Sequence, residues 1–154
     1  MKKPRKAKKI STAKQVKKLF NRCSDLWREH AYLRDGLICQ VKKHFPQIQV
    51  MHSEIFQVDH CFSRNNKHLF FDTSNSTVVC RNCNGFKHRQ QKGVHLAVHE
   101  IVKKREGEDI YNRMLGQEQR KGANMGWGKI WWLESQCNIL TELTNEQKKN
   151  KCNM

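Results

Sequence analysis

The sequence predicts an α+β fold, with a small zinc-supported core of two short strands and a helix between an amphipathic N-terminal helix and further C-terminal helices. Three observations lead to this. Apolar residues recur at helical spacing near the N-terminus, two short apolar segments flank a polar loop at 63–76, and Cys80 and Cys83 form a Cys-x2-Cys pair. Two short strands and one helix bury little apolar surface, and bound zinc would supply the missing stability.

The N-terminal segment divides into a basic arm and a helix. Residues 1–11 are basic, contain Pro4 and predict a flexible arm. A helix is expected over about 12–34, with capping-box spacing from Thr12 to Gln15 at its start and Asp35-Gly36 at its end. Its apolar face comprises Val16, Leu19, Phe20, Cys23, Leu26, Trp27 and Leu33.

The central and C-terminal elements follow in order. Residues 37–41 form an apolar run that fits a strand or a knuckle. The remaining expected elements are strands at 55–62 and 77–79, helices at 82–91, 94–105, 109–119 and 129–142, a glycine-containing linker at 122–128 and a polar tail from 145. We therefore divide the chain into the arm 1–11, a domain with flanking helices over 12–121, and a C-terminal part over 122–154.

The charge distribution predicts a nucleic acid as the partner. The chain of 154 residues carries a net charge of +16, and residues 1–24 hold ten Lys or Arg and no acidic residue. Such a basic arm on a milder body is typical of a protein that binds a polyanion, although a solvated tail is the plainer alternative. No apolar run is long enough to span a bilayer and no secretory signal is evident, so we expect a cytoplasmic protein. The oligomeric state stays open, with a homodimer among the options.

Four polar residues suggest the chemistry of phosphodiester hydrolysis. Asp59 and Asn84 offer the carboxylate and amide oxygens that a hard cation such as Mg²⁺ accepts, and His60 is left to act as a general base. Asn75 would orient the His60 ring or the loop that carries it. Because Asp59 and His60 are neighbours on a strand, their side chains point to opposite faces unless the strand is irregular, and we expect an irregular end there.

This order of residues over about 12–115 resembles the HNH, or ββα-metal (His-Me finger), endonucleases, and more narrowly the NinG/Rap group of phage recombination nucleases. The resemblance implies a metal ion, Mg²⁺ or Mn²⁺, on Asp59 and Asn84, with His60 as the base and Asn75 orienting it. It also implies a DNA endonuclease acting on branched or single-stranded DNA in the host cytoplasm. Many members have His at the position of Asn84, which puts the metal preference in doubt.

Members with this zinc knuckle usually carry a second Cys-x2-Cys before the first strand. Here Cys39 is present, but position 42 is Lys, so one ligand must come from elsewhere. We expect zinc on Cys39, Cys80 and Cys83 with His44 as the nearest fourth candidate; His52 and Cys61 are alternatives.

The remaining candidates are basic and aromatic. Two clusters around the site could contact phosphates or form a solvated face; one contains Arg64, Lys67 and His68, and the other Lys87, His88 and Arg89. His95 and His99 are expected to be surface residues, and the tryptophans near the last helix are expected to pack in the core. Two other functions compete with this one: a non-catalytic zinc module that binds nucleic acid, and a free-standing HNH endonuclease of the homing or restriction type.

Overall fold

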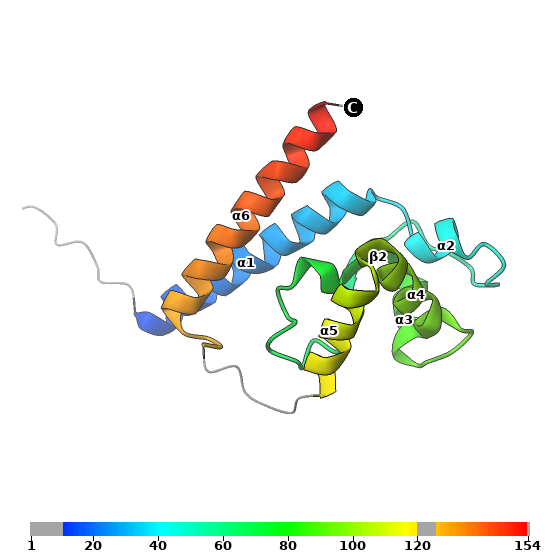
Figure 1. Cartoon of the computed structure of the whole chain (residues 1–154), viewed down its shortest axis with the longest axis horizontal. Helices are drawn as coiled ribbons and strands as arrows, with labels where there is room; N and C mark the ends of the chain where they lie inside the picture. The colour runs from blue at the N-terminus through cyan, green and yellow to red at the C-terminus, as the bar shows by residue number, and fades with distance from the viewer. Residues whose placement is uncertain (1–10, 120–125, 154) are drawn as a thin grey trace, which may run out of the picture.

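The computed structural model describes residues 11–119 and 126–153, and it is an α+β protein (Figure 1). Most of the predicted arm 1–11 and of the linker 122–128 therefore lies outside the described residues. The elements are α1 (Thr12–Asp35), α2 (Gln40–His44), β1 (Phe56–His60), the 3₁₀ turn η1 (Thr73–Asn75), β2 (Ser76–Cys80), α3 (Arg81–His88), α4 (Val94–Glu106), α5 (Glu108–Gln119) and α6 (Ile130–Cys152).

The two strands form an antiparallel sheet that is regular to its end. Pairing runs without interruption from Phe56 opposite Cys80 to His60 opposite Ser76. The irregular strand end expected at Asp59 and His60 is therefore wrong. The alternation of a regular strand sends the two side chains to opposite faces, Asp59 toward α3 and His60 toward α1.

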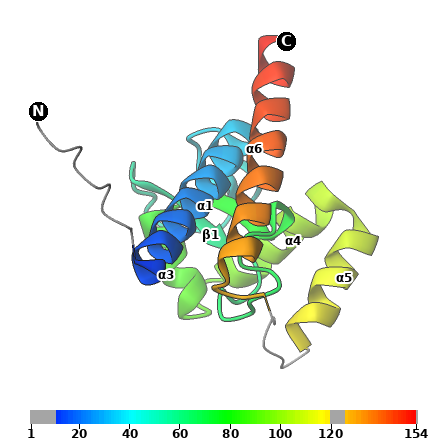
Figure 2. The same ribbon diagram turned by 90° about the vertical axis from the view of Figure 1, so that its left-hand side faces the viewer.

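Two apolar clusters hold the helices around the sheet. The first cluster joins α2, α4 and α5 to the sheet and contains Val41, Val79, Val98 and Met114. The second cluster packs α1 against α6 and contains Trp27, Leu133 and Leu140. Figures 1 and 2 show α1 and α6 side by side, starting at the same end of the molecule and separating toward the C-terminus of α6.

A buried charge network fixes the C-terminal end of α1 against the sheet. Arg34 donates to the Asp35 carboxylate at 2.6 and 2.8 Å and to the carbonyl of Ser76 at 2.9 Å. Asp35 accepts from the backbone N–H of Val78 at 3.2 Å, and Arg105 of α4 donates to the Ser76 carbonyl at 2.8 Å. One end of α1 is thereby tied to both β2 and α4, which sets the direction of the helix beside β1.

Most predicted elements are present, with three differences. Residues 37–41 do not form a strand; Cys39 is instead the N-cap of α2. The N-cap of α1 is Ser11, and it makes no side-chain capping bond. Helix α6 continues to Cys152, through the segment expected to be a polar tail. In the part of the chain that the structure describes, no helix combines the length and apolarity needed to cross a membrane.

The packing of α6 gives a direct stability test. Leu140 is 1% exposed in the second cluster, whereas its neighbour Ile139 is 47% exposed. We expect Leu140→Ala to lower the free energy of unfolding by about 2–5 kcal/mol, because it leaves a cavity. Ile139→Ala should change it by about 0.5 kcal/mol. Urea denaturation monitored by circular dichroism measures both, and equal losses would contradict the packing of α1 on α6.

Candidate metal centre and candidate active site

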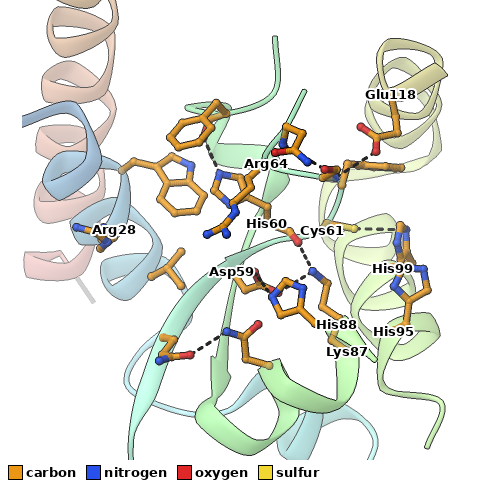
Figure 3. A pocket seen from close by; sticks show the side chains of 18 of the residues that line it. Arg28, Asp59, His60, Cys61, Arg64, Lys87, His88, His95, His99 and Glu118 are labelled. Atoms are coloured by element: carbon orange, nitrogen blue, oxygen red, sulfur yellow. Dashed lines mark hydrogen bonds and ion pairs between the residues drawn. The ribbon is translucent and has the colours of Figure 1, made fainter. Parts of the chain in front are cut away.

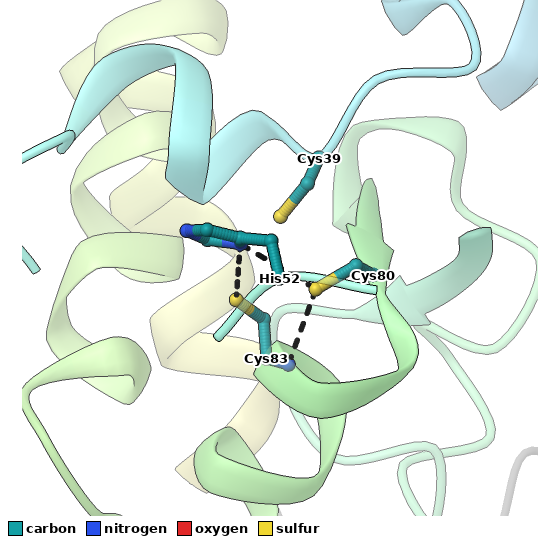
Figure 4. Close-up of side chains that lie close together, drawn as sticks. All are labelled: Cys39, His52, Cys80 and Cys83. Atoms are coloured by element: carbon teal, nitrogen blue, oxygen red, sulfur yellow. Dashed lines mark hydrogen bonds between the residues drawn. The ribbon is translucent and has the colours of Figure 1, made fainter. Parts of the chain in front are cut away.

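Three cysteines and one histidine meet on one side of the sheet (Figure 4). One ligand atom from each of Cys39, His52, Cys80 and Cys83 lies within 4.8 Å of all the others. Nδ1 of His52 is 3.5 Å from Sγ of Cys80 and 3.4 Å from Sγ of Cys83. Tetrahedral zinc with Zn–S bonds of about 2.3 Å places its ligand atoms roughly 3.8 Å apart, so this group can hold a metal ion of that kind.

The local folding of β2 and the two short helices assembles this group. Cys80 ends β2 and caps α3, and its Sγ accepts a hydrogen bond from the backbone N–H of Cys83 at 3.5 Å. Cys39 caps α2. The hydrogen bond with the Cys83 side chain lowers the pKa of Cys39, and the same contact raises the pKa of Cys83. The pair therefore favours one thiolate, and a thiolate is the form that binds metal.

The fourth member is His52, so the expectation of His44 is wrong. His44 stands at the far end of α2, where it lines a different cavity with Lys43 and Lys104. The chain then turns back, and the segment before β1 is held against α3: Asn82 Nδ2 donates to the Met51 carbonyl at 2.6 Å. That bond places His52 beside Cys80 and Cys83. The sequence offered His52 only as an alternative, because its spacing from these cysteines does not show that they meet. Cys61 lies elsewhere, 3.4 Å from His99 Nδ1, and burial raises its pKa to about 12.

A separate cavity of about 900 Å³ surrounds the end of β1 (Figure 3). Its lining includes the predicted residues Asp59, His60, Asn84, Lys87 and Arg64. Helix α1 contributes Trp27 and Arg28 to the wall, and α4 contributes His95 and His99. The cavity is therefore built from β1, α1, α3 and α4 together.

His60 is held in one orientation and one tautomer. Its ring stacks on Trp27 with centroids 4.3 Å apart and an interplanar angle of 19°. Nε2 lies 2.8 Å from the carbonyl oxygen of Phe70. Since a carbonyl only accepts, Nε2 carries the proton and Nδ1 keeps a free lone pair. Burial lowers the pKa of His60, which favours this neutral form.

Asn75 fixes the loop behind His60 and does not touch its ring. The side chain is fully buried, and Oδ1 accepts from the backbone N–H of Phe62 at 2.7 Å. Nδ2 donates to the carbonyls of Leu69 at 3.1 Å and Phe62 at 3.4 Å. Asn75 therefore joins the two ends of the loop that supplies the Phe70 carbonyl, and it positions His60 through that carbonyl.

Lys87 is buried against Asp59, so it is no exposed phosphate contact. Its Nζ is 2.6 Å from Asp59 Oδ2 and also donates to the carbonyl of His60. The other carboxylate oxygen, Oδ1, faces His88, whose Nε2 is 3.7 Å away. Asp59 thus uses one oxygen in an ion pair inside the protein and turns the other toward the cavity residue His88.

Asn84 and His88 lie one turn apart on α3 and both line the cavity. Asn84 Nδ2 donates to Gln57 Oε1 at 2.8 Å, and this bond orients the amide. Its Oδ1 is buried and has no hydrogen-bond partner in the part of the chain that the structure describes, which is unusual for a buried amide oxygen. The sequence placed His88 only in a basic cluster and did not single it out as a neighbour of Asp59, although the i, i+4 spacing from Asn84 puts both on one face of α3.

The other basic candidates are dispersed. Arg64 lines the cavity, whereas Lys67 lies over the Trp127 ring at 4.5 Å and Arg89 over the Phe86 ring at 5.0 Å. His68 does not line the cavity. A contact with DNA stays a prediction for Lys67, His68 and Arg89.

Two further expectations concern aromatic residues. His99 is half-buried in the cavity wall, where its Nδ1 lies 2.8 Å from the hydroxyl of Tyr111, so the pair His95 and His99 is no simple surface feature. Burial lowers the pKa of His99 to about 4. Trp127 packs in the second cluster as expected, but Trp131 is 64% exposed.

Comparisons with protein-family models, with curated proteins and with solved structures find no match to this chain.

Replacing His52 or His44 by alanine distinguishes between these two candidates for the fourth zinc ligand. We expect purified protein to hold about one zinc ion per chain, and His52→Ala to lose most of it because three ligands bind zinc more weakly than four. His44→Ala should keep its zinc. Metal content by mass spectrometry and thermal unfolding with a chelator are the measurements. Zinc loss in His44→Ala but not in His52→Ala would contradict the assignment.

Proposed function

We propose that the chain is a metal-dependent DNA endonuclease of the HNH, or ββα-metal, type, with β1, β2 and α3 as its catalytic core. The observation that carries this proposal is the state of His60. A neutral imidazole, held by a carbonyl on one nitrogen and open on the other, lines the same cavity as Asn84, whose Oδ1 has no hydrogen-bond partner among the described residues, and as Asp59. A general base beside a cation site is what hydrolysis of a phosphodiester requires.

His60 acts as the base through Nδ1. Trp27 holds the ring by stacking, and the Phe70 carbonyl holds the proton on Nε2. A water molecule at Nδ1 can therefore give up its proton as it attacks phosphorus, and the resulting imidazolium stays hydrogen-bonded to the carbonyl. Asn75 contributes by keeping the loop, and hence the carbonyl, in place.

Asp59, Asn84 and His88 would hold the catalytic cation. Asn84 Oδ1 is buried without a partner, and Asp59 Oδ1 faces His88 Nε2 across 3.7 Å, so the donor set fits a divalent ion. Such an ion supplies charge neutralisation at the phosphate and at the leaving oxygen. An imidazole in the set favours Mn²⁺ over Mg²⁺, because nitrogen ligands suit transition metals better.

The substrate we propose is branched or single-stranded DNA, as in phage recombination. Support for a nucleic acid comes from the net charge of +16 and from Arg28 and Arg64 in the cavity wall, which can bind phosphates. The preference for branched or unpaired strands comes from the resemblance to the NinG/Rap nucleases. The Cys₃His group would be the structural zinc site that supports α3.

A cleavage assay tests this function. Duplex, single-stranded, flapped and four-way-junction DNA are incubated with the protein and Mg²⁺ or Mn²⁺, and then with EDTA. We expect metal-dependent cleavage, fastest on a branched or single-stranded substrate. DNA binding without cleavage of any substrate would instead support a non-catalytic zinc module, and sequence-specific duplex cleavage would support a homing or restriction-type enzyme.

Substitutions at the end of β1 separate base from metal ligand. We expect His60→Ala to lower the cleavage rate by about 10²–10⁴ without weakening DNA binding, because only proton transfer is lost. Asp59→Asn should also be slow, but excess Mn²⁺ should partly restore it. His95→Ala, in the same cavity wall, is the matched control and should stay active. Cleavage at the normal rate by His60→Ala would exclude this site as the catalytic centre.

Lys87 provides a test of the cation site that needs no activity. Lys87→Met leaves the Asp59 carboxylate buried without a counter-charge, which costs about 3–5 kcal/mol of stability. A divalent ion then restores charge balance, so Mn²⁺ should raise the melting temperature more in Lys87→Met than in the unaltered protein. Lys87→Arg keeps the charge and should respond like the unaltered protein. The measurement is thermal unfolding with and without Mn²⁺. An equal rise of the melting temperature in the unaltered protein and in both variants would contradict a cation at Asp59.

A further inference from the structure

A second cavity, of about 460 Å³, lies between α2 and α4. It shares no lining residue with the candidate active site. Its walls are formed by Arg34, Asp35, Gln40, Lys43, His44, Phe45, Glu100, Ile101, Lys104 and Arg105. The volume is in the range of pockets that hold small organic ligands, about 300–1,000 Å³.

The inner charges of this cavity are already neutralised within the fold. Arg34 pairs with Asp35 at 2.6 Å, and Arg105 lies 3.6 Å from the same carboxylate while also pairing with Glu106. These groups fix α1 and α4 to the sheet, as described above. These groups have a structural role, although Nη1 of Arg105 makes no hydrogen bond within the described residues. The outer residues are the ones that a ligand would reach first.

The outer residues leave two lysines without partners. The side chains of Lys43 on α2 and Lys104 on α4 make no ion pair or hydrogen bond within residues 11–119 and 126–153. Glu100 also lines the cavity, one turn before Lys104, and it forms no ion pair with that lysine among these residues. The adjacent Lys103, by contrast, pairs with Glu108 at 3.0 Å.

Both lysines influence the same side chain, that of His44. His44 has its pKa lowered by burial first and then by the charges of Lys43 and Lys104, whereas Asp35 opposes them. Both lysines are therefore close enough to His44 to influence it, although they stand on different helices. An anion placed between them would be attracted by both and would face the imidazole edge of His44.

We propose that this cavity binds a phosphate group carried by a nucleotide-sized ligand. Lys43 and Lys104 bind the phosphate from opposite helices, and His44 donates to it when protonated. Phe45 is half-buried at the wall, packed against the first apolar cluster, and its exposed part offers an apolar surface for a nucleobase. This site is separate from the proposed nuclease centre and does not depend on it.

The phosphate can belong to a free nucleotide or to the end of a DNA strand, and the experiment distinguishes these sources. Isothermal titration is carried out with AMP, with inorganic phosphate, and with a short oligonucleotide bearing either a 5′-phosphate or a 5′-hydroxyl. AMP binding alone identifies a free-nucleotide site. Tighter binding of the 5′-phosphorylated strand than of the 5′-hydroxyl strand identifies a strand end. Both results support the proposal, and absence of binding by all the phosphate-bearing probes overturns it.

Paired variants localise the binding. Lys43→Gln with Lys104→Gln should weaken binding of the best probe about ten- to a hundredfold, because charge-assisted hydrogen bonds are lost. Lys103→Gln, on the same helix but paired with Glu108, is the control and should bind normally. Equal affinity in the double variant and the unaltered protein overturns the proposal, as does an equal loss in the control.

The titration of His44 by NMR gives an independent readout. Bound phosphate favours the imidazolium, so the pKa of His44 should rise on addition of the ligand, against the lowering by Lys43, Lys104 and burial. His95, in the other cavity, should not follow it. An unchanged His44 titration at saturating ligand would overturn the placement of the phosphate beside this residue.

Discussion

The contact between Cys39, His52, Cys80 and Cys83 joins three segments that otherwise make few connections. A sheet of two five-residue strands buries little apolar surface and is marginal by itself. The cluster closes β2 onto the start of α3 and pulls in the chain before β1. Because α3 carries the candidate ligands Asn84 and His88, the geometry of the candidate active site depends on this cluster, and metal binding would contribute directly to folding.

Strand β1 divides the candidate active site into two independently supported halves. Its regular alternation sends Asp59 to one side and His60 to the other. On one side α3 contacts the carboxylate through Lys87, and on the other α1 contacts the imidazole through Trp27. A helix outside the strand–strand–helix unit is therefore part of the site, and the buried charges around Asp35 keep that helix in place.

Lys87 shows how a fold can carry the counter-charge for a functional carboxylate. A buried carboxylate without a partner is strongly unfavourable, so Asp59 must be neutralised in the absence of any other cation. The ammonium group occupies Oδ2 and leaves Oδ1 turned to His88. The proposed cation would thus share the carboxylate with a resident positive charge, an arrangement that keeps the protein folded before metal binds.

The sequence by itself determined both strands, most of the helices and the residue types of the sites, but not the short helix α2 or the full length of α6. Helical periodicity predicted α1, α4 and α5, because an amphipathic pattern is a local property, and the knuckle spacing pointed to Cys80 and Cys83. Only the tertiary structure decided that His52, and not His44, completes the cluster, and that Lys87 is buried. Those outcomes depend on how the chain returns between α2 and β1 and on which face of α3 meets β1. Contacts of this kind are set by packing over long sequence separations, and no local pattern records them.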